Sequence, residues 1–200
     1  MLKVYGDYRS GNCYKVKLML HLLGQDYQWV AVNILRGENR APEFLAKNPN
    51  GKVPVLEWAD GLCLWESNAI LHSLAEGSEY LPSDPRLRTQ VLQWQFFEQY
   101  SHEPYIGLAR YQKIYEGIDA QSLPLYKQRL AEGYHALSVM EQQLQRTDFL
   151  VGEHCSVADV ALYAYTHVAP EGGFDLSRFP ALQRWLERIQ ALPNYVGMFE

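Results

Sequence analysis

The chain of 200 residues lacks several features that would assign it to a class at once. It has only three cysteines, Cys13, Cys63 and Cys155, an odd and widely spaced set that argues against a disulfide framework. No apolar run is long enough to cross a bilayer. Residues 1–7 read as a strand and lack the anatomy of a signal peptide. Together these features favour a reducing, cytoplasmic location.

Positive charge is also scarce. Lysine and arginine total 18 against 23 aspartates and glutamates, which gives a net charge of −5, whereas nucleic-acid binding favours clustered basic residues. The six histidines show neither H-x-x-x-H nor H-E-x-x-H spacing, and no glycine-rich phosphate loop is present. We therefore expect no nucleic-acid partner, no membrane partner and no metal.

What the chain does contain is an ordinary globular composition, with 48% hydrophobic and 20% charged residues and enough length for one or two domains. Periodicity and breaker residues in the first third predict an α/β unit. Its expected order is β-α-β-α-β-β-α, over residues 2–6, 12–23, 27–32, 42–47, 52–57, 62–65 and 67–75. This unit forms an expected first domain, residues 1–77.

After a linker rich in breakers, residues 78–85, the chain changes character. No further convincing strand follows, and residues 86–200 form an expected all-helical domain. Its helices are predicted over residues 86–115, 123–147, 157–167 and 180–191. We expect the first of them to be kinked or broken near Pro104.

The segment Asn48–Leu56 is the most informative part of the chain. A proline starts the strand that ends it, and because Pro54 has no N–H we expect an edge at this end of the strand. The backbone of Val53 is then available to a peptide-like ligand. Ser67 follows at a helix start, where unpaired N–H groups attract a carboxylate. This pairing suits a small acidic peptide such as glutathione.

Ser156-Val-Ala-Asp159 precedes an apolar helix and matches a capping box, with Asp in place of the usual Glu or Gln. Its expected role is structural.

Three segments together, Asn48–Leu56, Glu66–Ile70 and Phe149–Leu162, resemble the cytosolic glutathione transferases, with the Pro-bearing linker between them. The match runs nearly end to end, and it is closest to bacterial-type members with a serine-type active site. The resemblance implies a thioredoxin-like N-terminal domain, an all-α C-terminal domain, a cis peptide bond at Pro54 and a homodimer.

The reaction implied is attack of the glutathione thiolate on an electrophile. A free thiol has a pKa of about 8.5, so the protein must donate a hydrogen bond to sulfur and hold positive potential near it. Aligning Tyr14–Lys17 with the family's helix start places Ser10 at the donor position. Ser10 also suits a helix cap, and the two roles are compatible because capping uses the oxygen as acceptor.

Two neighbours of Ser10 are further candidates. Asn12 could donate an amide N–H to the sulfur. Cys13 could form a mixed disulfide, although Ser10-Gly-Asn-Cys13 resembles a C-x-x-C motif whose exposed first position has become serine. An inert, buried thiol is the commoner situation for the second position.

By resemblance, the glutathione site recruits residues from three segments. Val53 pairs its backbone with the cysteinyl unit, and Pro54 fixes that geometry. Ser67 binds the γ-glutamyl carboxylate at the helix start, and Glu66 takes the ligand's ammonium group.

The resemblance also implies residues for the glycyl end of glutathione and for the electrophile. Asn39, Arg40 and Lys52 are expected to reach the glycyl carboxylate of glutathione. The electrophile pocket is expected between the first long helix and the chain end, with Tyr105 and Arg110 as the favoured lining residues.

We therefore predict a glutathione transferase that conjugates glutathione, as co-substrate, to small hydrophobic electrophiles. One alternative is a glutathione-dependent thiol transferase or reductase that uses Cys13. Another is a non-catalytic, transferase-like binding or regulatory protein. An isomerase or dehalogenase remains compatible with the same glutathione site.

Overall fold

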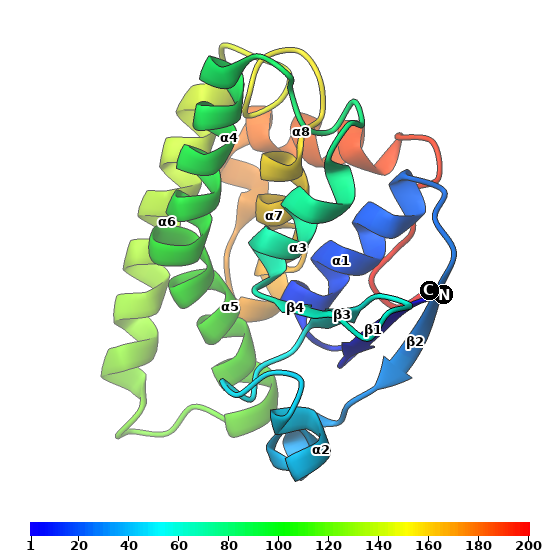
Figure 1. Cartoon of the computed structure of the whole chain (residues 1–200). Coiled ribbons are helices and arrows are strands. Elements are labelled where there is room, and N and C mark those ends of the chain that lie inside the picture. The colour runs from blue at the N-terminus through cyan, green and yellow to red at the C-terminus, as the bar shows by residue number, and fades with distance from the viewer. The chain divides into compact units, whose positions relative to one another are not determined.

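The computed structural model describes all of residues 1–200, which form two compact units. The first unit contains residues 1–78 together with residues 192–200, and the second contains residues 79–191. Figure 1 labels the elements along the chain.

The first unit has the expected order β-α-β-α-β-β-α of a thioredoxin-like domain. Its elements are β1 (Leu2–Gly6), α1 (Gly11–Leu22), β2 (Tyr27–Ala31), α2 (Pro42–Leu45), β3 (Val55–Glu57), β4 (Cys63–Trp65) and α3 (Ser67–Ala75). Two short 3₁₀ turns, Ile34–Arg36 and Glu38–Arg40, precede α2. The sequence predicted every one of these helices and strands, with boundaries that differ by at most three residues.

The four strands form one sheet in the order β2-β1-β3-β4. β1 runs parallel to β2 and antiparallel to β3, and β3 is antiparallel to β4. Successive side chains of a strand point to opposite faces, so the sheet has two separate cores.

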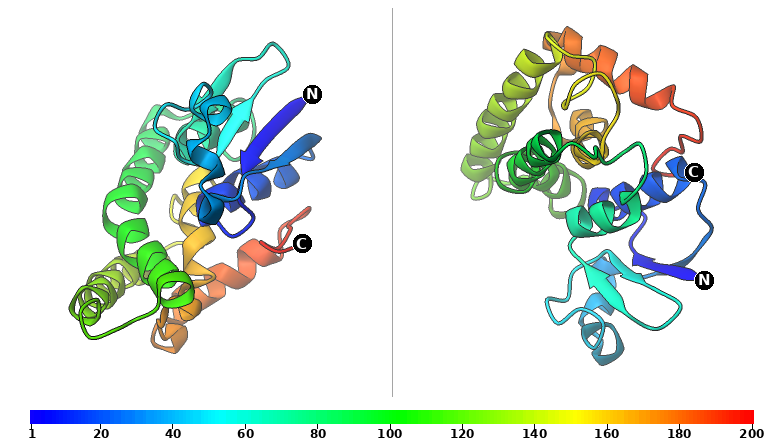
Figure 2. Two further views of the ribbon diagram at one scale, coloured as in Figure 1. Left: turned by 90° about the horizontal axis from the view of Figure 1, so that it is seen from below. Right: turned by 45° about the horizontal axis from the view of Figure 1, so that its top comes forward.

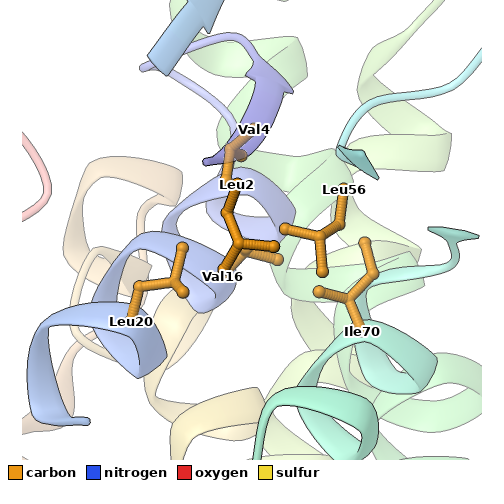
Figure 3. Packing of buried hydrophobic residues seen from close by; sticks show 6 residues of the cluster. All are labelled: Leu2, Val4, Val16, Leu20, Leu56 and Ile70. Atoms are coloured by element: carbon orange, nitrogen blue, oxygen red, sulfur yellow. The ribbon is translucent and has the colours of Figure 1, made fainter. Parts of the chain in front are cut away.

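On one face Leu2, Val4 and Leu56 pack against α1 and α3 through Val16, Leu20 and Ile70 (Figure 3). On the other face Val55 packs with Val32 and with Phe44 of α2. The alternation of Val55 and Leu56 in β3 thus places one helix layer on each side of the sheet.

The expectation of an edge at Pro54 is wrong. β3 lies between β1 and β4, and Val55 is paired on both sides, with Tyr5 and with Trp65. Pro54 is compatible with an interior strand because it precedes the first paired residue, so no ladder hydrogen bond needs its missing N–H.

Residues 192–200 belong to the first unit, whereas the sequence pattern groups them with the helical domain. The reason is a set of hydrogen bonds from α1. Tyr14 Oη donates to the carbonyl of Val196 at 2.9 Å, and Lys17 Nζ donates to the carbonyl of Gly197 at 3.2 Å. Figure 2 shows this last segment, in red, beside α1.

The second unit is helical, with only an isolated bridge between Phe149 and Gly152. Its helices are α4 (Pro85–Phe97), α5 (Glu103–Tyr111), α6 (Leu123–Leu144), α7 (Val157–Thr166) and α8 (Pro180–Gln190). Between α4 and α5 the chain makes a π-helical turn, Glu98–His102, which ends two residues before Pro104. The expected irregularity near Pro104 is therefore a widened turn, since proline cannot donate to the preceding helical turn.

The start of α7 is a capping box, as the sequence predicts. Ser156 Oγ accepts a hydrogen bond from the N–H of Ala158, and Asp159 Oδ2 accepts one from the N–H of Ser156 at 2.9 Å. The other oxygen, Oδ1, accepts from the N–H of Leu150 at 2.8 Å and from Trp185 Nε1 at 2.9 Å. Burial raises the pKa of this fully buried carboxyl against the effect of these donors.

We expect Asp159→Ala to lower the free energy of unfolding by roughly 3 kcal/mol, because it leaves several buried donors without an acceptor. Urea unfolding of the variant measures this loss. Asp148→Ala is the matched control, since Asp148 forms only an exposed ion pair with Arg188 and its loss should cost less than about 1 kcal/mol. Equal unfolding midpoints for wild type and Asp159→Ala would contradict the structural role.

A second polar cluster surrounds Glu57, the last residue of β3. The Glu57 carboxylate accepts hydrogen bonds from Lys47, from Lys3 Nζ at 3.0 Å and from Tyr5 Oη at 2.9 Å. The hydrogen bonds from Lys47 and Lys3 lower the pKa of Glu57 from 4.5 to about 2. Folding therefore favours the ionised carboxylate.

Because the pKa of Glu57 is lower in the folded state, its stabilisation is complete above about pH 4.5 and is lost as the pH falls toward about 2. We expect Glu57→Gln to lower the melting temperature at about pH 7 and to approach wild type at about pH 2.5. Glu43→Gln, at an exposed position of α2, is the control and should match wild type at both pH values. A melting-temperature difference that does not narrow on acidification would refute this linkage.

Candidate active site

Three chain segments meet at one end of the sheet of the first unit. Val55 is opposite Tyr5 of β1 and opposite Trp65 of β4. β1 ends one residue after Tyr5, at Gly6, β4 ends at Trp65 itself, and β3 begins at Val55, directly after Pro54. The loop into α1, the Val53–Pro54 turn and the start of α3 thus converge.

Ser10 caps α1, the helix that begins at this end of the sheet. Its Oγ accepts a hydrogen bond from the N–H of Cys13 at 3.3 Å, and its carbonyl accepts one from the N–H of Tyr14. The N–H groups of Gly11 and Asn12 make no hydrogen bond within the chain. This helix end therefore offers two free donors and the positive end of its dipole.

The loop that carries Ser10 is braced by Asp7, a residue that the sequence reading did not single out. The buried Asp7 carboxylate accepts two hydrogen bonds from the Arg9 guanidinium, at 2.8 and 2.6 Å, and another from the N–H of Ile34. Burial alone would raise the pKa of Asp7, but the hydrogen bonds from Arg9 and Ile34, together with the charge of Arg9, lower it overall. An acid and an arginine two residues apart, directly after a strand, are the signal that could have found this brace.

Cys13 lies in the interior of the first unit. Its side chain is fully buried, and burial raises the pKa of its thiol to about 12. A thiol of this kind is almost entirely protonated at neutral pH, and the thiolate is the reactive form. The geometry therefore disfavours Cys13 as a nucleophile and matches an inert, buried cysteine.

Ser67, at the first position of α3, contacts α1 directly. Its hydroxyl donates to Asn12 Oδ1 at 3.2 Å and accepts a hydrogen bond from Lys15 Nζ at 3.3 Å. Lys15 is fully buried, which is rare for a lysine. No motif marks Lys15 in the sequence, and its only signal is a basic residue one turn after Asn12 on an apolar helix.

Glu66 precedes α3 with an unusual backbone conformation. Its φ is +72° and its ψ 110°, in a region that residues with a side chain rarely adopt. Its exposed side chain does not cap the helix, and the N–H of Ser67 makes no hydrogen bond within the chain. Strained backbone of this kind concentrates at binding sites, so it is consistent with the expected ligand role of Glu66.

Val53 is half-buried, and neither its N–H nor its carbonyl makes a hydrogen bond within the chain. Both groups are therefore available to an extended ligand. The Val53–Pro54 peptide bond is cis, which confirms the sequence prediction.

The three residues expected near the glycyl end lie around one loop. Asn39 Nδ2 donates to the carbonyl of Gly51 at 2.7 Å, and Arg40 Nη1 donates to the carbonyl of Asn50 at 3.3 Å. The side chain of Lys52, the next residue, is exposed. Asn39 and Arg40 therefore hold the loop in shape, and the role of the exposed Lys52 toward a ligand stays a prediction.

Tyr105 and Arg110 lie in α5 of the second unit. Tyr105 is half-buried, whereas Arg110 is buried and its Nε donates to Glu171 Oε2 at 2.6 Å. A substrate anion would have to compete with Glu171 for this guanidinium. Their role in an electrophile pocket stays a prediction.

The first unit has an aromatic pocket of its own, beside the loop that leads to Ser10. It has a volume of about 310 Å³, and its walls include Tyr8, Tyr14, Trp29 and Phe199. This size is near the lower end of small-molecule pockets. Phe199 comes from the chain end, and Lys17 and Glu200 add charged groups to the lining.

Two further observations concern metal ligands and membrane-spanning helices. No three His, Cys, Asp or Glu side chains gather in a way that could hold a metal ion. No helix has both the length and the apolar character needed to span a membrane.

Comparison with known proteins identifies the family. The family model described as "Glutathione S-transferase, N-terminal domain" matches residues 1–76. The model described as "Glutathione S-transferase, C-terminal domain" matches residues 94–193. The chain belongs to the glutathione S-transferase family, and its two units have that family's thioredoxin-like and helical folds.

Individual relatives agree with this assignment. A crystal structure of a glutathione S-transferase from Pseudomonas fluorescens is 65% identical, with a TM-score of 0.98 over 100% of this chain and 99% of that one. The disulfide-bond oxidoreductase YfcG of Escherichia coli is 32% identical over 91% of this chain and 87% of its own length. Ure2p in complex with glutathione is 26% identical, with a TM-score of 0.85 over 96% of this chain and 90% of the other.

We expect Glu66→Gly to raise the free energy of unfolding by about 1 kcal/mol, because glycine tolerates the positive φ, and to weaken glutathione binding through loss of the carboxylate. Thermal unfolding and calorimetric titration with glutathione measure the two effects. Ser73→Gly, at an exposed position of α3, is the control and should cost about 0.5 kcal/mol. A Glu66→Gly variant that is less stable yet binds glutathione normally would contradict both parts.

Proposed function

We propose that this protein is a glutathione transferase that ionises the glutathione thiol at the start of α1 and conjugates it to small hydrophobic electrophiles. The observation that carries the proposal is the convergence of α1 and α3 through Asn12 and Ser67, beside the unpaired backbone of Val53. The start of α1, the start of α3 and the free backbone groups of Val53 are the three kinds of group that would recognise a γ-glutamyl tripeptide. Family membership supplies the substrate class.

In this proposal the ligand is held at both ends. The N–H of Ser67 binds the γ-glutamyl carboxylate, and Glu66 binds the ammonium group. Val53 pairs with the cysteinyl unit, while Lys52, with Arg40 and Asn39 behind it, attracts the glycyl carboxylate. The thiol then lies at the start of α1.

Ser10 is the proposed donor to sulfur. Its oxygen already accepts from the N–H of Cys13, which leaves the hydroxyl proton to donate to the sulfur. The free N–H groups of Gly11 and Asn12 add positive potential, which favours the thiolate over the thiol. The Asn12 side chain is a second donor beside it.

The electrophile needs an apolar environment next to the thiolate. The aromatic pocket of the first unit is the proposed place for it, and the lining role of Tyr105 and Arg110 stays a prediction from the family resemblance. The proposed partner protein is a second copy of this chain, in line with the usual homodimer of the family.

A second candidate is disulfide reduction, which the name of the relative YfcG favours. In that case the bound glutathione thiolate attacks a disulfide, forms a mixed disulfide with one sulfur and releases the other as a thiolate. The thiolate of a second glutathione then attacks the glutathione sulfur of the mixed disulfide, which forms glutathione disulfide and releases the substrate's remaining sulfur as a thiolate. The burial of Cys13 argues that glutathione, and not the protein, would be the nucleophile.

The decisive test is a pH titration of thiolate absorbance for glutathione bound to wild type and to Ser10→Gly. Glycine is chosen because it removes the hydroxyl but costs a helix cap only a few tenths of a kcal/mol. We expect wild type to lower the thiol pKa well below its free value of about 8.5. Ser10→Gly should raise it by about one to two units, which lowers conjugation of an aromatic electrophile about 10- to 100-fold near pH 6.5.

Ser10→Thr, which retains a hydroxyl, should restore the low thiol pKa, and Cys13→Ala should match wild type. If Ser10→Gly behaves as wild type and Cys13→Ala fails, the Cys13 mechanism replaces this proposal. If wild type binds no glutathione, the fold acts as a binding or regulatory protein instead. Turnover of a disulfide but not of electrophiles would select the second candidate.

A further inference from the structure

Lys15 is a buried basic residue of the first unit that the proposed function leaves unused. It lies in α1 one turn after Asn12, and its side chain is fully buried. Its Nζ is 3.3 Å from Ser67 Oγ, so it joins α1 to the first residue of α3. A lysine is almost never fully buried unless it has partners, and the Ser67 hydroxyl is one partner of Lys15.

The direction of the hydrogen bonds around Ser67 is fixed by chemistry. An ammonium group donates and cannot accept, so the Ser67 oxygen must be the acceptor toward Lys15. The single hydroxyl proton of Ser67 then donates to Asn12 Oδ1, 3.2 Å away. The result is a relay from Lys15 through Ser67 to Asn12.

This relay distinguishes the two ends of the Asn12 amide, which have nearly the same shape. With Oδ1 held by the Ser67 hydroxyl, the two Nδ2 hydrogens point away from Ser67. A flipped amide would present its oxygen instead. The two orientations of the amide have opposite effects on a nearby thiolate, because an N–H stabilises the negative sulfur and a carbonyl oxygen repels it.

We propose that Lys15 is a positioning residue that, through Ser67, orients the Asn12 amide so that Nδ2 donates to the sulfur of bound glutathione. This inference rests on the proposed function and deepens it. It assigns Ser67 a second role besides the γ-glutamyl carboxylate, because its N–H serves the ligand while its hydroxyl serves Asn12. Lys15 itself does not touch the substrate.

The test is a double-mutant cycle read out as the pKa of the bound glutathione thiol. Lys15→Met and Ser67→Ala should each raise that pKa by about one unit, which is about a tenfold loss of thiolate at pH 6. Because both changes break the same relay, the double variant should be no worse than the more severe single variant. If the two effects add, the residues act independently and the relay is wrong.

Lys15→Gln separates the hydrogen bond from the charge. Glutamine donates an N–H without a positive charge, so the relay predicts a lower thiol pKa for Lys15→Gln than for Lys15→Met. Lys47→Met is the control, since Lys47 is bonded to Glu57 and not to this site, and its thiol pKa should match wild type. Equal thiol pKa values for Lys15→Gln and Lys15→Met would overturn the relay.

Should Lys15→Met fail to fold, the cycle between Ser67→Ala and Asn12→Asp tests the same relay with Lys15 in place. Asp has the shape of Asn but no N–H to donate, so Asn12→Asp should raise the thiol pKa, and Ser67→Ala should add nothing further to it. Additive effects here overturn the proposal as well. If the wild type lowers the thiol pKa but the effects in the cycles are additive, the relay alone is refuted. If the wild type binds no glutathione, both the proposed function and the relay are refuted.

Discussion

The antiparallel pairing of β3 with both of its neighbours is the constraint on which the candidate site depends. It sets Val55 opposite Tyr5 and Trp65 and thereby brings the loop after β1 and the start of α3 to the same end of the sheet. A shift of one residue would turn Leu56 out of the core shown in Figure 3. The packing of the core and the geometry of the site are therefore fixed by the same register.

Much of the fold could be predicted from the sequence because its signals are local. The Asp60-Gly61 turn marks the β3–β4 hairpin, and the Ser156–Asp159 capping box marks the start of α7. The interior position of β3 could not be predicted in this way. Pro54 signals only that its own N–H is unpaired, and which strands flank β3 is decided by the topology of the whole sheet.

The residues of the candidate site also differ in how far local sequence signals predict them. Ser10, Glu66 and Ser67 stand in sequence motifs, and the structure places Ser67 against Asn12. Lys15 and the Asp7–Arg9 brace have only weak local signals in the sequence, because their roles depend on tertiary contacts with Ser67 and Ile34. For Cys13 the sequence motif suggests a reactive thiol, but the side chain is fully buried, which disfavours that role.

The segment that follows α8 has a consequence for how this protein is made. Residues 192–200 leave the helical unit and complete the N-terminal unit, where Tyr14 and Lys17 of α1 hold their backbone. The thioredoxin-like unit is thus built from two stretches separated by the entire helical unit. During synthesis it gains its last piece only after that unit has emerged, which couples the folding of the two units through chain connectivity alone.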